Sequence, residues 1–316
     1  MTQKERERVE RWGLTVTLGV IAANVAIAEA QTRPRPSDFG QVWAAARFLL
    51  EGVNPYDAIG PHGTFTFQFP LFYPLTAAVA AVPVAPLPAA WADAVFMGIG
   101  TAALAWALTR HTTRNPQLLV FTSFAFLTAM GNVQWSPILT AAALLPPLGF
   151  LLACKPTLAV ALMAAYPSRV AILSAAGFGA ITTVLWPWWI GSWLATLPAG
   201  THFVAPVMLW GGPLVLLALL KWRRPEARLL VAMACIPHTP VLYETVPLFL
   251  VVQRWYEGAL LAMVTPLVWY LQDHYGGPYP SYDAWTIARA QWQVWLMYLP
   301  CVVMVLRRPN TATASE

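Results

Sequence analysis

The chain has 316 residues, of which 58% are hydrophobic and only 10% are charged, and its formal net charge is +5. An ordinary soluble domain carries about 25% charged residues, so the composition argues against a soluble globular protein and for one whose solvent is largely lipid. The cations lie in short clusters between apolar stretches and not along one face. They therefore indicate membrane topology, and we expect no nucleic-acid partner.

The order of apolar stretches predicts an all-α polytopic membrane protein, a single membrane domain over residues 1–316 with roughly nine to eleven membrane helices. The first run, 12–30, predicts a retained membrane helix. Prolines interrupt the next stretch, 71–108, whose first half we interpret as a dip into the membrane and not a crossing. Further candidate spans are about 118–130, 137–152, 170–186, 204–220, 229–252, 259–271 and 292–306.

Three clusters of Lys and Arg set the expected topology, at residues 4–11, 221–228 and 307–308. Such clusters favour the cytoplasmic side. We therefore expect a multi-pass protein of the cell membrane (inner or plasma membrane) with both termini in the cytoplasm. The Pro-rich stretch 31–70 then forms an outer loop, and the turn-rich stretch 273–289 forms a second one.

The clearest local pattern predicts a short amphipathic helix over residues 38–51 in the first outer loop, lying on the membrane surface. Ser37 is a plausible N-cap and Gly52 a plausible stop. Apolar residues recur near one face of this helix, at Phe39, Val42, Trp43, Ala46, Leu49 and Leu50. Asp38 falls in the first turn, where the helix dipole stabilises a carboxylate. This carboxylate is a candidate general base, unless it serves only to satisfy the helix end.

Several short motifs follow one another in a fixed order. They are Asp-Phe at 38–39, Trp-x-Ala-Ala-Arg at 43–47, Asn-Pro-Tyr-Asp at 54–57, Tyr-Pro-Leu at 73–75, the segment GNVQWSPILT from Gly131, and Lys155-Pro156. Together they resemble the first part of glycosyltransferase family 87, whose members are polyprenyl-phosphate-dependent mannosyl- and arabinosyltransferases with the GT-C membrane fold. The second half of the chain matches only loosely, through PHTPVLYE at 237–244. The chain is also shorter than is usual for that family.

The resemblance implies an inverting transfer of mannose or a pentose from a polyprenyl-phosphate donor to a lipid or glycan acceptor on the outer face. Asp38 matches the catalytic carboxylate by its place in the motif. The donor is a substrate, and neither a cofactor nor a metal is expected. Candidates for binding the donor phosphate are Arg47, Lys155, His238 and Arg254, and candidates for binding the acceptor or sugar are Tyr56, Asp57, Gln134 and Glu244.

Simpler interpretations remain for several of these residues. Arg47 has the spacing to pair with Glu51 on one helix face, and Lys155 and Arg254 have the placement of ordinary charges flanking membrane segments. His238 and Glu244 lie in an apolar run, where ionisable residues are costly and tend to be functional.

Two other classes of protein also fit the sequence. One is a non-catalytic chain of the same fold that serves as a structural subunit of a larger membrane complex. The other is a transporter or lipid flippase, although the inverted repeats that many transporters show are not evident. Membrane lipids are expected partners in every case.

Overall fold

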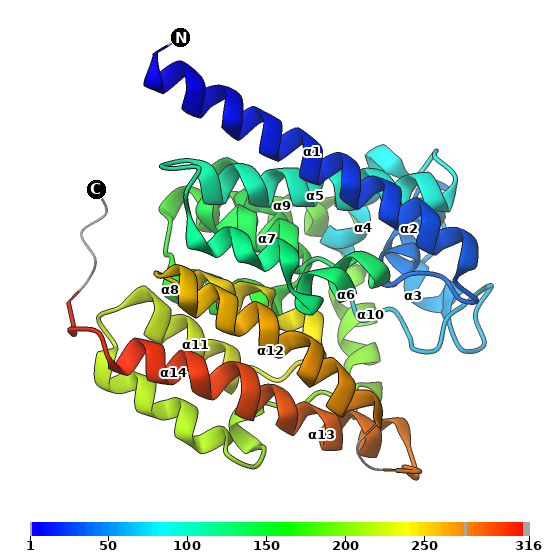
Figure 1. Ribbon diagram of the computed structural model, residues 1–316. Helices are drawn as coiled ribbons and strands as arrows, with labels where there is room; N and C mark the ends of the chain where they lie inside the picture. Colours follow the sequence, from blue (N-terminus) through cyan, green and yellow to red (C-terminus); the bar gives the residue numbers. More distant parts are fainter. Residues whose placement is uncertain (1, 275–276, 312–316) are drawn as a thin grey trace. The chain divides into compact units, whose positions relative to one another are not determined.

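The computed structural model describes residues 2–274 and 277–311 (Figure 1). Helices form nearly all of its regular structure, and the one sheet in this part of the chain is a parallel pairing of two-residue strands, β1 (Ile59–Gly60) and β2 (Phe65–Thr66). The all-α expectation is therefore confirmed. The chain folds into two compact units, and it passes from one to the other several times.

Unit 1 comprises Met1–Thr113, Ala129–Pro156 and Ser168–Gly200. Its α-helices and 3-10 helices are α1 (Gln3–Thr32), α2 (Asp38–Leu50), α3 (Pro55–Ala58), α4 (Leu75–Ala81), η1 (Val82–Val84), α5 (Ala89–Thr109), the end of α6 (Phe124–Asn132), α7 (Ser136–Leu144), η3 (Pro146–Cys154), α9 (Arg169–Leu185), α10 (Trp189–Thr196) and η4 (Leu197–Ala199).

The most extensive contact between two helices of unit 1 is a close antiparallel pairing of α1 with α5 (Figure 1). Small residues line the contact, and a Cβ on Gly19 would lie 3.0 Å from the carbonyl oxygen of Gly98 and 3.1 Å from Cβ of Ala102. Towards the N-terminus of α1, Trp12 packs against Trp106 with ring centroids 4.8 Å apart. Small residues let helix backbones approach closely, which is the usual basis of helix association in membranes.

We predict that Gly19→Leu destabilises the protein, because the added side chain meets the backbone of α5. Overpacking of this kind costs about 1–3 kcal/mol. The matched control is Gly13→Leu on the same helix, where a Cβ meets nothing within 4 Å. Thermal unfolding of the purified variants in detergent measures the difference, and equal melting temperatures for the two variants would contradict the close contact.

Unit 2 comprises Arg114–Thr128, Thr157–Pro167 and Thr201–Glu316. Its elements are η2 (Pro116–Thr122), the start of α6, α8 (Pro156–Ala165) apart from its first residue, η5 (Pro206–Met208), η6 (Gly212–Lys221), α11 (Pro225–Cys235), η7 (Leu242–Val251), α12 (Trp255–His274), α13 (Tyr282–Gln293), the π-helical turn η8 (Val294–Tyr298) and α14 (Leu299–Leu306).

A buried network of four charges connects the ends of the helices in unit 2. Arg308, just after α14, pairs with Glu257 of α12 at 2.7 Å and with Glu226 of α11 at 3.5 Å. Glu226 also pairs with Arg224 at 3.1 Å, and all four residues are buried. Two cations match two anions, so the network is neutral as a whole. The network contributes to the structure mainly by joining three helices at one point, because a buried ion pair adds little net stability compared with an apolar contact.

We predict that Arg308→Gln lowers the melting temperature clearly, because the substitution leaves two buried carboxylates short of a cation. Breaking a buried pair from one side typically costs about 3–5 kcal/mol. Arg307→Gln, an exposed neighbour with the same change of charge, is the control. If both variants unfold at the wild-type temperature, the network does not hold these helices together.

Fewer helices reach membrane length than the sequence suggested. In the described part of the chain, α1 and α5 are long and apolar enough to cross a membrane. A third candidate arises if α9 and the segment Trp189–Ala199, bent by 106° against each other, count as one span. Other apolar helices, such as Leu75–Val84, Pro156–Ala165, Gly212–Lys221 and Leu242–Val251, are shorter. The expected nine to eleven membrane helices are thus not reached as continuous helices.

Prolines account for much of this difference, because they remove a backbone donor and interrupt the helix. The predicted span 229–252 is divided where α11 ends at Cys235, and Pro237 and Pro240 follow before η7 begins at Leu242. The expected outer loop 273–289 is also not wholly turn-like. Its residues from Tyr282 onward belong to α13, whereas residues 275–276 lie outside the described part.

Candidate functional site

The start of α2 is held by a buried carboxylate on α5. Ser37, the N-cap of α2, accepts a hydrogen bond from the backbone N–H of Gly40 at 2.8 Å, and its own hydroxyl donates to Asp93 at 2.8 Å. The other oxygen of Asp93 pairs with Arg33, which follows α1, at 3.4 Å. Arg33 also donates to the carbonyl oxygen of Gly131. These contacts bring the end of α1, the start of α2, the start of α5 and the end of α6 to one place.

Asp38, the residue after the N-cap, is held by Gln134. The side-chain amide of Gln134 donates a hydrogen bond to a carboxylate oxygen of Asp38. Gln134 is almost fully buried, whereas Asp38 is half-buried. The structure therefore brings together two residues that the sequence placed in the site, 96 positions apart.

The backbone before Gln134 adopts a strained conformation. Val133 has φ 54°, and it is the one non-glycine residue with positive φ in the part of the chain that the structure describes. Its N–H donates to the carbonyl of Met130, and the N–H of Gln134 donates to that of Ala129. This is the Schellman pattern that ends many helices, usually with glycine at the position of Val133. A β-branched residue there is strained, and such strain often marks a functional site.

Next to Asp38, unit 1 contains a cluster of aromatic side chains. Phe39 stacks on Phe96 with centroids 4.0 Å apart, and Phe96 meets the edge of Trp135 at 4.8 Å. Trp135 in turn lies 6.2 Å from Tyr73. Phe39 and Trp135 are almost fully buried, so the cluster is part of the core, and Phe96 and Tyr73 are its half-buried members.

Lys155 and Tyr56 reach the same cluster through Tyr73. The ammonium of Lys155 lies 6.0 Å from the ring centroid of Tyr73. The hydroxyl of Tyr56 donates to the backbone carbonyl of Tyr73 at 3.1 Å. Burial raises the pKa of the Tyr56 phenol well above its usual range, so this group stays protonated and remains a donor. Four of the predicted site residues thus gather around Phe39, Trp135 and Tyr73.

The side chains of Arg47 and Asp57 contact other residues. Arg47 is exposed and its guanidinium lies 5.1 Å from the ring centroid of Trp43, so it stacks on Trp43, and the alternative pairing with Glu51 is not formed. Asp57 is exposed and accepts a hydrogen bond from Asn54 at 2.8 Å. This contact stabilises the short turn of α3.

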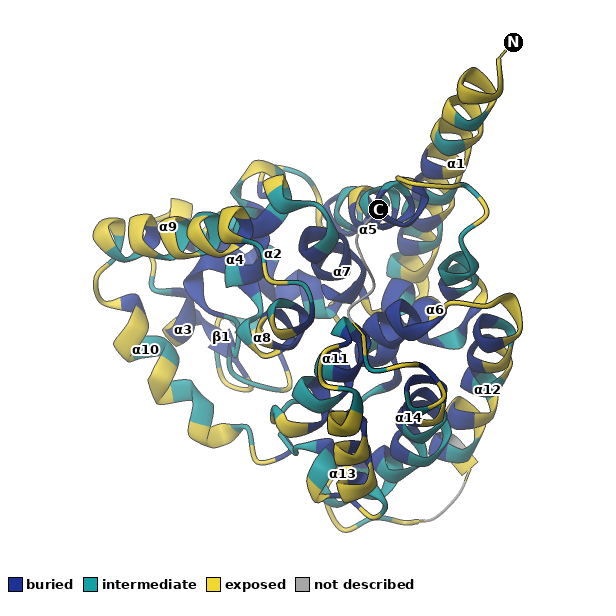
Figure 2. Ribbon diagram, turned by 90° about the vertical axis from the view of Figure 1, so that its left-hand side faces the viewer, coloured by how far each residue is buried: buried dark blue, intermediate teal, exposed yellow. Residues whose placement is uncertain are grey.

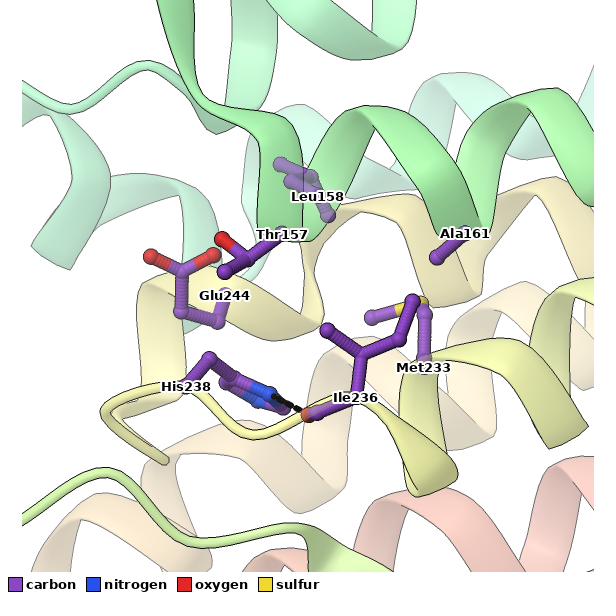
Figure 3. Close-up of a pocket in the computed structure, with 7 residues that line it drawn as sticks. All are labelled: Thr157, Leu158, Ala161, Met233, Ile236, His238 and Glu244. Atoms are coloured by element: carbon purple, nitrogen blue, oxygen red, sulfur yellow. Dashed lines mark hydrogen bonds between the residues drawn. The ribbon is translucent and has the colours of Figure 1, made fainter. Parts of the chain in front are cut away.

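Two further predicted residues, His238 and Glu244, line a small pocket in unit 2 (Figure 3). His238 is fixed by Nδ1, 2.8 Å from the carbonyl oxygen of Ile236, and by backbone pairing with Val204. Thr157 joins them at the polar end of the pocket, while Met233 and Ala161 form the apolar end. The cavity measures about 10 Å³, close to the smallest volume that holds one water molecule.

Arg254, the fourth candidate for the donor phosphate, lies apart from that pocket. Its side chain is exposed and donates to the hydroxyl of Tyr256 at 2.9 Å, just before α12. Its backbone N–H donates to Glu257, the residue that Arg308 also binds. This arrangement fits the simpler interpretation of a charge at the end of a helix.

Asp93 and Arg33 are the residues that the sequence analysis missed. A signal was present, because Asp93 is a single acidic residue within an apolar helix, and such residues are costly unless they have a partner or a function. The partner could not be identified from the sequence, since Arg33 is one of several cations in the loop. Within the described residues, no group of three or more His, Cys, Asp or Glu side chains is placed to hold a metal ion.

Comparisons of the chain with protein-family models, with curated proteins and with solved structures gave no match.

We predict that Asp93→Ala destabilises unit 1, because the substitution leaves Arg33 and the Ser37 hydroxyl without their shared acceptor. Loss of one partner of a buried pair costs about 3 kcal/mol or more. Asp57→Ala removes an exposed carboxylate and should change the melting temperature little. Equal thermal stability of the two variants would show that Asp93 does not hold α2 to α5.

Proposed function

We propose that the chain is a polytopic integral membrane glycosyltransferase of the family 87 type. It transfers a mannose or a pentose from a polyprenyl-phosphate donor to a lipid or glycan acceptor, with Asp38 as the general base. The observation that carries the proposal is the hydrogen bond from Gln134 to Asp38. It joins the two segments on which the family resemblance depends most, 37–57 and 131–140.

The surface of several helices supports a membrane location. On α9, large apolar side chains point outward, with Leu173 70% and Val184 81% exposed. Figure 2 shows that α9 and α10 are exposed over much of their length. Along α1, only a narrow face is buried against α5, while Val16, Val20 and Ile21 are exposed. Soluble proteins rarely expose contiguous apolar faces of this extent, and lipid would cover them in a membrane.

The proposed location is the cell membrane, with several passes and with both termini in the cytoplasm. The shorter apolar helices, such as η6 and η7, would complete their passage as broken segments covered by neighbouring helices. Broken helices are tolerated at membrane depth where protein covers their free backbone groups. In this arrangement, α2 and Asp38 lie at the outer face.

The proposed reaction is a single displacement with inversion. The acceptor hydroxyl gives its proton to Asp38 while its oxygen bonds to the anomeric carbon of the sugar. The bond from that carbon to the phosphate oxygen breaks, and the electron pair leaves with the polyprenyl phosphate. Gln134 fixes the orientation of the carboxylate, and Lys155, whose ammonium lies beside the ring of Tyr73, is the candidate cation for the leaving phosphate. The ring of Tyr73, which is half-buried, would face the sugar.

A transporter is the alternative that one observation favours. The buried charges at Arg224, Glu226, Glu257 and Arg308 resemble the ion-paired groups that line transport paths inside helical bundles. The other alternative, a non-catalytic subunit of a membrane complex, requires no function for Asp38. Both alternatives predict that purified protein transfers no sugar from a prenyl-phosphate donor.

We predict that Asp38→Asn lowers sugar transfer by at least the ~10² typical of a lost general base. The amide keeps the size of the side chain but cannot accept the proton, and losing a first-turn charge costs only about 0.3–1 kcal/mol of stability. The control is Asp283→Asn, which changes a first-turn aspartate of α13 in the same way. The assay uses mannosyl and arabinosyl prenyl phosphates with the purified full chain.

If the wild type transfers no sugar from either class of donor, and Asp38→Asn changes no measured property, the enzymatic proposal is wrong. The chain is then better described as a structural subunit or a transporter.

A further inference from the structure

A second cavity lies in unit 1, between the C-terminal end of α1 and the N-terminal end of α5. Its volume is about 320 Å³, at the lower end of the ~300–1,000 Å³ of small-molecule sites. The C-terminal end of α1 contributes Ala30, and Arg33 follows it. The N-terminal end of α5 contributes Ala89, Ala90 and Asp93 on the facing side. Because α1 and α5 are antiparallel, these ends lie at the same level.

The charged residues that line this cavity carry a net charge of +1, from two arginines and one aspartate. The titratable groups in its lining are Arg33, Arg35 and Asp93. Asp93 is 4% exposed and has both oxygens engaged, one with Ser37 and one with Arg33. Arg35 is exposed and makes no hydrogen bond or ion pair with any residue of 2–274 or 277–311. An anion in this cavity would therefore meet the guanidinium of Arg35, which has no ion pair within the described residues, and beside it that of Arg33.

The remaining lining is largely apolar and aromatic. Trp43 and Phe65 form part of the wall together with Pro36 and the alanines at the two helix ends. The indole N–H of Trp43 already donates to the carbonyl of Leu87 at 3.1 Å, so its ring presents an apolar surface. Trp rings at this level are typical of the zone between lipid headgroups and acyl chains. A free inorganic anion would gain nothing from these walls.

We propose that this cavity binds the phosphate-bearing headgroup of an anionic phospholipid. The guanidinium of Arg35, with the outer edge of Arg33, binds the phosphate, and the glycerol and first acyl carbons lie against Trp43, Phe65 and Ala90. Arginine suits this ligand because its planar donors match phosphate oxygens two at a time. The site rests on α1 and α5 crossing a membrane. It does not rest on the transferase proposal, and its test measures binding alone.

The test follows the melting temperature of the purified full chain in a non-ionic detergent. Short-chain phosphatidylglycerol, phosphatidylcholine with the same chains, farnesyl phosphate and inorganic phosphate are titrated separately. We expect phosphatidylglycerol to raise the melting temperature of the wild type with saturation, and the other three to act at much higher concentration or not at all. Greater potency of farnesyl phosphate or phosphatidylcholine, or equal potency of inorganic phosphate, would overturn the assignment.

Three variants locate the binding. Arg35→Gln should raise the half-saturating concentration of phosphatidylglycerol at least about tenfold, since one charge-assisted contact is lost. Ala90→Leu changes no charge but fills part of the cavity, and it should weaken binding as well. Arg8→Gln, an exposed arginine at the opposite end of α1, is the matched control and should respond as the wild type does. If Arg35→Gln and Arg8→Gln respond equally, or Ala90→Leu binds normally, the cavity is not the site.

Discussion

The arrangement of unit 1 depends on the burial of one carboxylate, that of Asp93 on α5. A carboxylate removed from water is tolerated only when its oxygens are hydrogen-bonded and its charge is paired. Asp93 meets this requirement with Ser37 and Arg33. Since Ser37 also caps α2, its bond to Asp93 fixes the start of that helix, and with it Asp38, against α5. Arg33 in turn binds the carbonyl of Gly131, which brings the following segment and Gln134 to the same place. The position of Asp38, the candidate base, therefore depends on the hydrogen bonds that the buried carboxylate of Asp93 requires.

The same region shows why close helix packing matters. The contact between α1 and α5 at Gly19 and Gly98 leaves no room for larger side chains. It places Arg33 beside Asp93 at one end and Trp12 beside Trp106 at the other. If α1 and α5 cross a membrane, apolar side chains alone would provide little drive for their association, and close backbone contact and a few polar bonds would carry the pairing. The ion pair and the small residues therefore act together, the residues by permitting the approach and the pair by fixing its register.

Local features of the fold could be predicted from the sequence, and features that depend on tertiary contacts could not. The helix expected over 38–51 is present as α2, Asp38–Leu50, with Ser37 as its N-cap, because capping chemistry is local. Its surroundings differ from the expectation: Ala44 and Ala45 are buried as well as the predicted apolar face, while Leu50 is exposed. The left-handed backbone at Val133 had no sequence signal, since glycine or asparagine is the usual residue there. The number of continuous long helices was overestimated, because hydropathy reports composition and not where prolines divide a helix.

The two carboxylates beside each other at the start of α2 differ in what they can do. Asp93 is almost fully buried, and each of its oxygens already accepts a hydrogen bond that holds α1 or α2 to α5, so this carboxylate serves the structure. Asp38 is half-buried, and the amide of Gln134 holds one of its oxygens from the protein side. A general base must lie within hydrogen-bond reach of the proton that it takes, which favours the more accessible carboxylate. The strained turn at Val133 then has a physical reason. It directs Gln134 from the end of α6 towards Asp38, so that a buried amide orients the more accessible carboxylate.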